Sequence, residues 1–458
     1  MENAMIIDRM IDNAKQALDA FRNFNQEQID GCVKAMLLAF KAEAETLSKE
    51  VIAETGLGHY ESKLEKNTGS PDAIWYALKG RKSVGVIGED REKGLKFVAQ
   101  PKGILSSVAP TTNPNITVLF NAAFAVKGRN VLIVAPHPRA KKTTLHTVEI
   151  LNGALRAQGA PENVLQCVEE PSIELTRLLM KQSNVIIATG GAAMVESAYS
   201  SGRPAFGVGP GNVQTIIDQG FDYAEAAAQI AVGRKFDNGL ICAGNQSVIM
   251  PKSDEDRIVA ALKENGVHYV EDPAEVEKFR GTLFPDGRHI NGALVGRSAP
   301  EVAEAVGADV PEGTEVIMLK GDSARIGAAD PLCGEKMCPV LISLTYDAFE
   351  EAVEIAKTNL LYQGAGHSAV LHTYDEKKME YAGVTLPVSR LLINQPGIFA
   401  ANPALANGFN PTSTLGCGSW GNNSISENLT FEHLINISRI GMIRGAKDIP
   451  SVEQIWED

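Results

Sequence analysis

The stretch ILSSVAPTTNPNITVLFNAAFAVKGRNVLIVAPHPRAKKTT, residues 104–144, carries the pattern that decides the fold. Its two apolar runs, 104–109 and 131–135, flank a segment long enough for an amphipathic helix. Further β-branched runs, again separated by segments of helix length, follow at residues 164–168, 184–188 and 213–217. Such alternation indicates βαβ units whose mostly parallel sheet is covered on both faces. We therefore predict an α/β fold.

A second α/β block is expected to follow the first. Its strand-like runs lie at 247–250, 315–319 and 339–344, and its helical patterns at 254–264 and 347–359. Two helices should precede the first block. One has its apolar face over residues 6–21. The other begins at a capping box formed by Asn25 and Gln28, and Gly56 and Gly58 can close it.

Two segments are expected to form β-structure outside these blocks. The runs 83–87 and 95–99 flank a charged, Gly-containing segment and predict a hairpin. The late apolar run 433–443 predicts a strand. A strand needs a pairing partner, and another subunit is a candidate for it.

Composition excludes several classes of protein. The chain has 458 residues, 44% hydrophobic and 22% charged, and a net charge of −13 that argues against nucleic-acid or anionic-membrane partners. It has no apolar run of about 18 residues and no signal-peptide pattern, so we expect a cytoplasmic protein. The 6 cysteines are dispersed without a CxxC pair, which predicts reduced thiols. No HExxH or His/Cys cluster occurs, so no metal site is expected.

Three loops follow strands of the first block and are candidates for a ligand site. They are PTTNPN (110–115), PHPRAKKTT (136–144) and Thr189-Gly190-Gly191. Doubly wound sheets bind ligands at the carboxyl ends of their strands, where helix N-termini offer free N–H groups to phosphates. The basic residues of the second loop either add positive charge to this site or form a solvated helix face.

Cys242 lies in the Gly-containing segment FDNGLICAGNQS, residues 236–247. Glycines let backbone amides approach a reacting atom closely, as an oxyanion hole beside a nucleophile requires. A single cysteine is nevertheless more often a small buried hydrophobe than a nucleophile.

Eight motifs, in order along the chain, resemble the coenzyme-A-acylating branch of the aldehyde dehydrogenase superfamily, including the aldehyde half of bifunctional aldehyde-alcohol dehydrogenases. They are ETGLG (54–58), PTTNP (110–114), APHPRAK (135–141), ATGG (188–191), AYSSGRPAFGVGPGN (198–212), FDNGLIC (236–242), GAGH (364–367) and LGCGSWGNNSISEN (415–428). Four further segments resemble CoA-dependent succinate-semialdehyde dehydrogenases: GRKFDNG (233–239), EKMCPV (335–340), GFNPTSTLGCGSWG (408–421) and HLINISRIG (433–441).

The resemblance implies an aldehyde dehydrogenase-like fold with three parts. These are a Rossmann-type nucleotide-binding domain over residues 1–237, an α/β catalytic domain over 238–430 and a C-terminal oligomerisation strand and tail over 431–458. The hairpin at 82–103 would belong to the same small β oligomerisation element, and the resemblance implies that it pairs with the strand at 433–443 across a subunit boundary. The resemblance also implies NAD or NADP as cofactor, coenzyme A as co-substrate, and a homodimer or higher homo-oligomer.

A catalytic role follows for each matching residue. Cys242 matches the nucleophile, whose thiolate attacks the aldehyde carbon and leaves an acyl thioester after hydride transfer. The Cys242 backbone N–H and a donor from Thr112 or Asn113 would form the oxyanion hole. His367 is the candidate base or polar partner for CoA, or else a structural histidine. Glu335 matches the glutamate that holds the nicotinamide ribose, or else it is a surface carboxylate.

Further residues are expected to bind ligands. The cofactor-binding set is Pro110, Thr111, His137, Pro138, Thr189, Gly190, Gly191, Gly209 and Glu335. The substrate-binding set is Arg139, Ser247, Ile398 and Phe399. Arg139 either clamps a distal carboxylate of the aldehyde or contacts a cofactor phosphate.

Gly207 departs from the hydrolytic aldehyde dehydrogenases, which carry a water-activating glutamate at that place. A thiol is a better nucleophile than water near neutral pH, so CoA should take the acyl group. Two departures concern the substrate: Asn245 stands where succinate-semialdehyde relatives carry Glu, and Ile398 and Phe399 replace small polar residues. Succinate semialdehyde is favoured, with sulfoacetaldehyde or acetaldehyde as alternatives; a hydrolytic enzyme and a non-catalytic assembly protein are the rival hypotheses.

Overall fold

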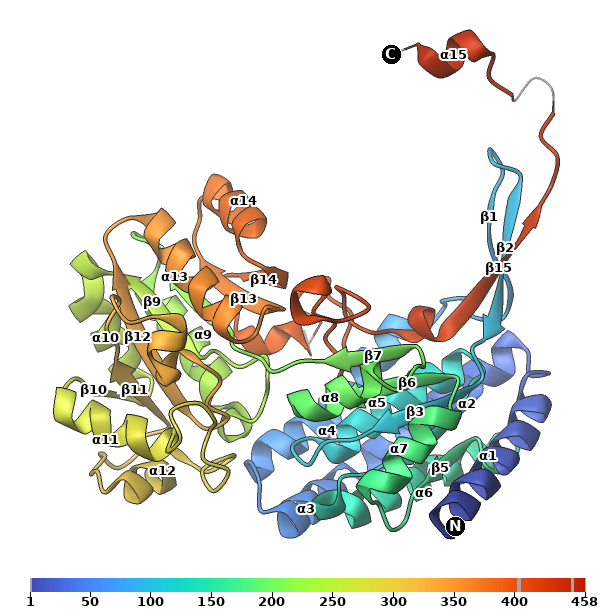
Figure 1. The fold of residues 1–458 in the computed structure, drawn as a ribbon, viewed down its shortest axis with the longest axis horizontal. Coiled ribbons are helices and arrows are strands. Elements are labelled where there is room, and N and C mark those ends of the chain that lie inside the picture. Colours follow the sequence, from blue (N-terminus) through green and yellow to red (C-terminus); the bar gives the residue numbers. More distant parts are fainter. Residues whose placement is uncertain (1, 402–404, 446–448, 458) are drawn as a thin grey trace.

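The computed structural model describes residues 2–401, 405–445 and 449–457. Two parallel sheets lie beside each other, and a narrow three-stranded arm projects from the first (Figure 1). This arrangement confirms the predicted α/β class.

The first sheet has the strand order β5-β4-β3-β6-β7, and its strands are parallel. The strands are β3 (Ile104–Val108), β4 (Val131–Ala135), β5 (Leu165–Cys167), β6 (Val185–Thr189) and β7 (Ala205–Val208). The helices that follow them are α5 (Pro114–Lys127), α6 (Lys141–Ala157), α7 (Ile173–Gln182) and α8 (Ala192–Tyr199). Because β3 lies between β4 and β6, the chain order reverses there, and a crevice opens beyond the carboxyl ends of these strands.

Burial explains why these runs became strands and helices. All five residues of β4 are buried, as expected for a strand covered on both faces. Helix α5 is buried along its whole length because it is apolar on nearly every side. Pro114 occupies its first turn, where the missing N–H costs no helical hydrogen bond.

Four helices pack beside the first sheet: α1 (Glu2–Phe21), α2 (Gln26–Ala42), α3 (Ala44–Thr55) and α4 (Tyr60–Leu78). The predicted capping box is present, with Asn25 Oδ1 accepting from the Gln28 N–H at 3.0 Å. The single helix expected up to Gly56 is instead two, because the chain leaves helical geometry at Glu43 before α3 begins. Gly56 ends α3 in the left-handed conformation.

The second sheet has the order β10-β11-β12-β9-β8-β13-β14, again parallel. Its strands are β8 (Gln214–Ile217), β9 (Ser247–Pro251), β10 (Val267–Val270), β11 (Val316–Lys320), β12 (Val340–Tyr346), β13 (Gly366–His372) and β14 (Val388–Ile393). Its helices are α9 (Tyr223–Lys235), α10 (Glu255–Glu264), α11 (Pro273–Leu283), α12 (Ala299–Val306), α13 (Phe349–Tyr362) and α14 (Glu376–Thr385).

One strand lies in a different sheet from the one we expected. The run 213–217 was predicted in the first block, but β8 pairs with β9 and β13 of the second sheet. The chain therefore crosses between the sheets after β7, over residues 209–213. An apolar run predicts a strand but does not choose its partner, because strand pairing depends on distant residues.

The hairpin of β1 (Gly85–Asp90) and β2 (Leu95–Pro101) pairs with β15 (Ile435–Gly441) in the order β1-β2-β15. This pairing occurs within one chain, so the expectation that these strands meet across a subunit boundary is wrong. They form the projecting arm, beyond which lies α15 (Val452–Trp456) (Figure 1). Within the described residues, no helix has the length and apolarity needed to cross a bilayer, and no cluster of metal-ligating side chains occurs.

We predict that a chain ending after Leu434 aggregates, because loss of β15 exposes the hydrogen-bonding edge of β2. A chain ending after Gly441 keeps β15 and serves as the matched control. Size-exclusion chromatography with light scattering measures the outcome. A shorter chain with the same solubility and mass distribution as the control would contradict the prediction.

Candidate active site

A cavity of about 430 Å³ lies where the two sheets meet. Thirteen of the predicted site residues line it: Pro110, Thr111, Thr112, Asn113, His137, Thr189, Gly190, Gly191, Gly209, Cys242, Glu335, Ile398 and Phe399. Two of the three predicted loops, those after β3 and β6, therefore share one edge of the sheet. The third loop contributes only His137.

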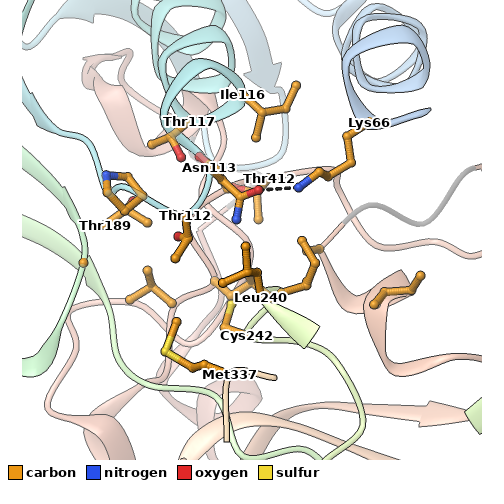
Figure 2. A pocket seen from close by; sticks show the side chains of 18 of the residues that line it. Lys66, Thr112, Asn113, Ile116, Thr117, Thr189, Leu240, Cys242, Met337 and Thr412 are labelled. Atoms are coloured by element: carbon orange, nitrogen blue, oxygen red, sulfur yellow. Dashed lines mark hydrogen bonds between the residues drawn. The ribbon is translucent and has the colours of Figure 1, made fainter. Parts of the chain in front are cut away.

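Cys242 is half-buried in this cavity, opposite the amino end of α5 (Figure 2). The 3₁₀ turn Phe236–Gly239 precedes it, with Asp237 and Asn238 at positive φ. A Cβ at Gly211 would lie 1.8 Å from the Cys242 carbonyl oxygen, so only glycine permits this contact. Burial, and then the charge of Glu335, raises the pKa of the thiol to about 12. The thiol is therefore protonated at neutral pH, and its activation requires a proton acceptor or an added positive charge.

Glu335 enters the cavity beside the crossover between the sheets. Its Oε1 accepts a hydrogen bond from the Gly211 N–H at 3.2 Å. Burial raises the pKa of this carboxyl to about 7, against the opposing effects of the Gly211 hydrogen bond, Arg234 and Lys336. Glu335 is thus a cavity carboxyl that changes its charge near neutrality, rather than a surface carboxylate.

Thr112 and Asn113 both line the cavity where the β3 loop becomes α5. Asn113 is the N-cap of α5, but its side chain makes no capping hydrogen bond. Instead its Oδ1 accepts from Lys66 Nζ (Figure 2), while the Thr112 carbonyl accepts from Lys63 Nζ at 2.7 Å. Sequence reasoning missed both lysines. The available signal was their spacing of three residues, which places them on one face of α4.

Four predicted residues lie outside the lining of the cavity, and two are tied to other partners. Ser247 is buried in β9 and donates to Gln214 Oε1 at 2.8 Å, so it is a structural residue and not a substrate ligand. Arg139 and Pro138 are exposed in a 3₁₀ turn after β4. The Arg139 guanidinium donates to the Thr55 carbonyl at 3.3 Å. The clamp that we expected on the aldehyde's distal anion is therefore not formed by Arg139.

His367 is fully buried in β13. Neither ring nitrogen has a hydrogen-bond partner among the described residues. Desolvation, and then the neighbouring Arg390 charge, lowers the pKa of the imidazole to about 3. A neutral imidazole with so low a pKa is a weak base, so this geometry gives no support to the expected base role.

The aldehyde end of the cavity has an apolar wall that includes Ile398 and Phe399. Asn245 lies behind this wall, fully buried. Its Oδ1 accepts from the Gly397 N–H at 3.2 Å and its Nδ2 donates to Thr215 at 2.7 Å. Asn245 therefore anchors the segment that carries both bulky side chains, and it acts on cavity size through them.

The cofactor-binding edge has the features that a dinucleotide needs. Gly191 caps α8 without a side chain, which leaves first-turn amides available to a phosphate. A Cβ at Gly191 or Gly209 would meet no atom within 4 Å, so the space in front of them is open. The residues present therefore fit NAD or NADP at this edge.

The fold and the cavity together define an α/β protein with a half-buried cysteine in a cavity between two parallel sheets. The aldehyde dehydrogenase family model matches residues 1–286. The chain is 53% identical over 456 residues to an acetylating succinate-semialdehyde dehydrogenase of Clostridium kluyveri, covering 100% of both chains. It is 38% identical to a sulfoacetaldehyde dehydrogenase of an Acholeplasma species, over 98% of this chain and 93% of that one. The crystal structure of an acetylating aldehyde dehydrogenase from Geobacillus thermoglucosidasius shares 34% identity, with a TM-score of 0.93 over 98% of both chains.

This chain belongs to the aldehyde dehydrogenase family, which confirms the resemblance inferred from its motifs. Gly207 then has a clear structural meaning. A Cβ there would lie 2.6 Å from Val195 Cγ1 and 3.0 Å from Tyr199, both on α8. Position 207 therefore has no glutamate, and the side chains of α8 leave no room for one.

We predict that Glu335→Gln speeds alkylation of Cys242 above about pH 7, where Glu335 is ionised. A nearby carboxylate disfavours the thiolate, so its removal lowers the pKa of Cys242 and raises the thiolate fraction. Iodoacetamide kinetics against pH, without nucleotide, measure the shift. Glu65→Gln, in the same cavity, is the control. A slower reaction in Glu335→Gln would contradict the assignment.

Proposed function

We propose that this protein is an NAD(P)-dependent, CoA-acylating aldehyde dehydrogenase. The closed position at Gly207 carries the proposal, because it leaves the cavity without the glutamate that activates water in hydrolytic relatives. Similarity to two proteins described as acetylating aldehyde dehydrogenases supports it. A non-catalytic assembly role is disfavoured, since Cys242 and Glu335 line a formed cavity.

In the proposed reaction the Cys242 thiol loses its proton to water, and the thiolate adds to the aldehyde carbon. The developing oxyanion accepts hydrogen bonds from the Cys242 N–H and Asn113 Nδ2. The bound nicotinamide supplies the hydride acceptor. The acyl group then remains on Cys242 as a thioester until the thiol of coenzyme A displaces it. Glu335, with a pKa raised to about 7, can hold a ribose hydroxyl in its ionised form.

Succinate semialdehyde is the favoured substrate. The 53% identity to the Clostridium kluyveri protein supports this choice. The bulk of Ile398 and Phe399 in the cavity instead favours a shorter aldehyde. Sulfoacetaldehyde, named in the Acholeplasma relative, is therefore the alternative, together with acetaldehyde. The test is to reduce succinyl-, sulfoacetyl- and acetyl-CoA and to monitor each reaction through the consumption of NADH or NADPH. The kcat/KM values then rank both the substrates and the cofactors.

The cytoplasmic location and the homo-oligomeric state remain proposals. Dispersed free cysteines suit a reducing compartment. The outer edge of β15 has no strand beside it among the described residues, so a second copy can cover it. Arg139 is proposed to contact a phosphate of the nucleotide or of CoA, because it lies beside the cavity residue His137.

We predict that Cys242→Ala abolishes turnover while nucleotide binding persists, because no other atom can hold the acyl group. Wild-type enzyme given aldehyde and oxidised nucleotide without CoA should release at most one reduced nicotinamide per active site. Stopped-flow absorbance of the reduced nicotinamide records the burst. Sustained turnover without CoA would overturn the acylating mechanism.

We predict that Arg139→Ala raises the KM for nucleotide or CoA by one to two decades, as loss of a charge-assisted hydrogen bond of about 1.5–3 kcal/mol implies. The ratio of kcat/KM for succinate semialdehyde to that for acetaldehyde should stay constant. Arg156→Ala, exposed at the far end of α6, is the control. A fall in kcat/KM confined to succinate semialdehyde would contradict this prediction and would indicate that Arg139 binds the substrate.

A further inference from the structure

A cluster of three buried charges lies directly beneath the loop that carries Thr112 and Asn113. Lys63 and Lys66 of α4 both donate to Asp237 Oδ2, the first at 2.8 Å. The exposed fractions of the three side chains are 2%, 9% and 0%. Buried charges are retained only when they are paired and hydrogen-bonded. Such a cluster next to a cavity therefore requires an explanation.

The backbone around Asp237 is shaped to hold its carboxylate in place. Asp237 has a φ of +53°, and its Oδ1 accepts from the His59 N–H at 3.0 Å. The Ser62 hydroxyl accepts from the Asp237 N–H at 3.0 Å. Gly58 lies so close that a Cβ there would be 2.2 Å from the carboxylate. The carboxylate is thus fixed between α4 and the turn that leads to Cys242.

The cluster has two cations for one anion, and each lysine also donates a hydrogen bond to an acceptor on the loop that carries Thr112 and Asn113. Lys63 Nζ donates to the Thr112 carbonyl at 2.7 Å, and Lys66 Nζ donates to Asn113 Oδ1. Burial lowers the pKa of Lys66 to about 8, so its ammonium form still predominates at pH 7. The ammonium is therefore available to hold the loop under ordinary conditions.

The contact of Lys66 decides which way the Asn113 amide faces. An ammonium has only donors, so the amide must turn its oxygen toward Lys66 and its two N–H donors away. Figure 2 shows the Asn113 nitrogen on the side of the cavity that holds Cys242. With the amide flipped, its nitrogen would face the Lys66 ammonium, donor against donor, and its oxygen would face Cys242, where it would repel the developing oxyanion instead of stabilising it.

We propose that Lys63 and Lys66, held by Asp237, are positioning residues that present the Asn113 amide N–H to the oxyanion formed on the aldehyde. This inference rests on the proposed function. As the carbon–sulfur bond forms, the carbonyl π electrons move to oxygen, and Asn113 donates a hydrogen bond without losing a proton. Neither lysine transfers a proton or touches the aldehyde.

Lys66 also lines the cavity, so its ammonium has a rival role as an anchor for an anionic aldehyde. Two of its three donors already serve Asp237 and Asn113, which favours positioning. The two roles predict different substrate dependence. Positioning affects every aldehyde alike, whereas an anchor affects only those with a distal anion.

The test compares Lys66→Met, Lys66→Arg and the exposed control Lys79→Met, using succinate semialdehyde and acetaldehyde. Lys66→Met should lower kcat for both aldehydes by about tenfold to a hundredfold, which is at or below the loss of about a hundredfold to a thousandfold that follows complete removal of an oxyanion donor. KM should change little, and Lys66→Arg should recover part of the loss. Lys79→Met should match wild type. A loss confined to succinate semialdehyde would overturn the proposal.

A double-mutant cycle separates positioning from a general structural effect. Asn113→Ala should remove the oxyanion donor, and adding Lys66→Met to it should cost no further activity. Independent, multiplicative losses would overturn the proposal, as would wild-type kcat in Lys66→Met. Nucleotide affinity reports folding in each variant. If wild-type enzyme turns over repeatedly without CoA, the proposed function fails. If turnover requires CoA but the losses from Asn113→Ala and Lys66→Met are independent of each other, only this inference fails.

Discussion

The backbone contact between Gly211 and Cys242 is the constraint on which the site depends. Gly211 lies in the crossover between the two sheets, and its missing side chain lets the chain pass against the Cys242 carbonyl. The Gly211 N–H also holds Glu335. One glycine therefore sets the positions of the nucleophile and of the carboxyl beside it. A side chain at that position would collide with the backbone of Cys242.

The cavity disfavours charge, and this property affects each titrating group in it. Burial raises the pKa values of Cys242 and Glu335 and lowers that of Lys66. A thiol kept protonated is protected from oxidation and alkylation while the cavity holds no substrate. The same low polarity strengthens each hydrogen bond to an oxyanion once one forms.

The choice of CoA over water follows from packing as well as from chemistry. A Cβ at position 207 would collide with Val195 and Tyr199, so helix α8 leaves no room there for a glutamate side chain. The acyl thioester then persists until a better nucleophile enters. Thiols meet that requirement near neutral pH, and the energy of the thioester bond is preserved in the product.

Local patterns in the sequence determined the elements and many of the site residues. The apolar runs at 104–109 and 131–135 became β3 and β4, and the loops after the strands supplied Thr112, Asn113 and Gly191 to the cavity. These predictions succeeded because period, caps and strand-end loops depend on neighbours in the chain. Motifs in order along both blocks were enough to place the chain in its family.

Only the tertiary structure decided which distant residues meet. It moved β8 into the second sheet, paired β15 with β2 of the same chain, and placed Arg139 and Ser247 outside the cavity. It also brought Lys66, some 47 positions before Asn113, against the catalytic loop. Sequence spacing cannot predict such contacts, because strand pairing and the burial of ion pairs depend on how separate elements pack together.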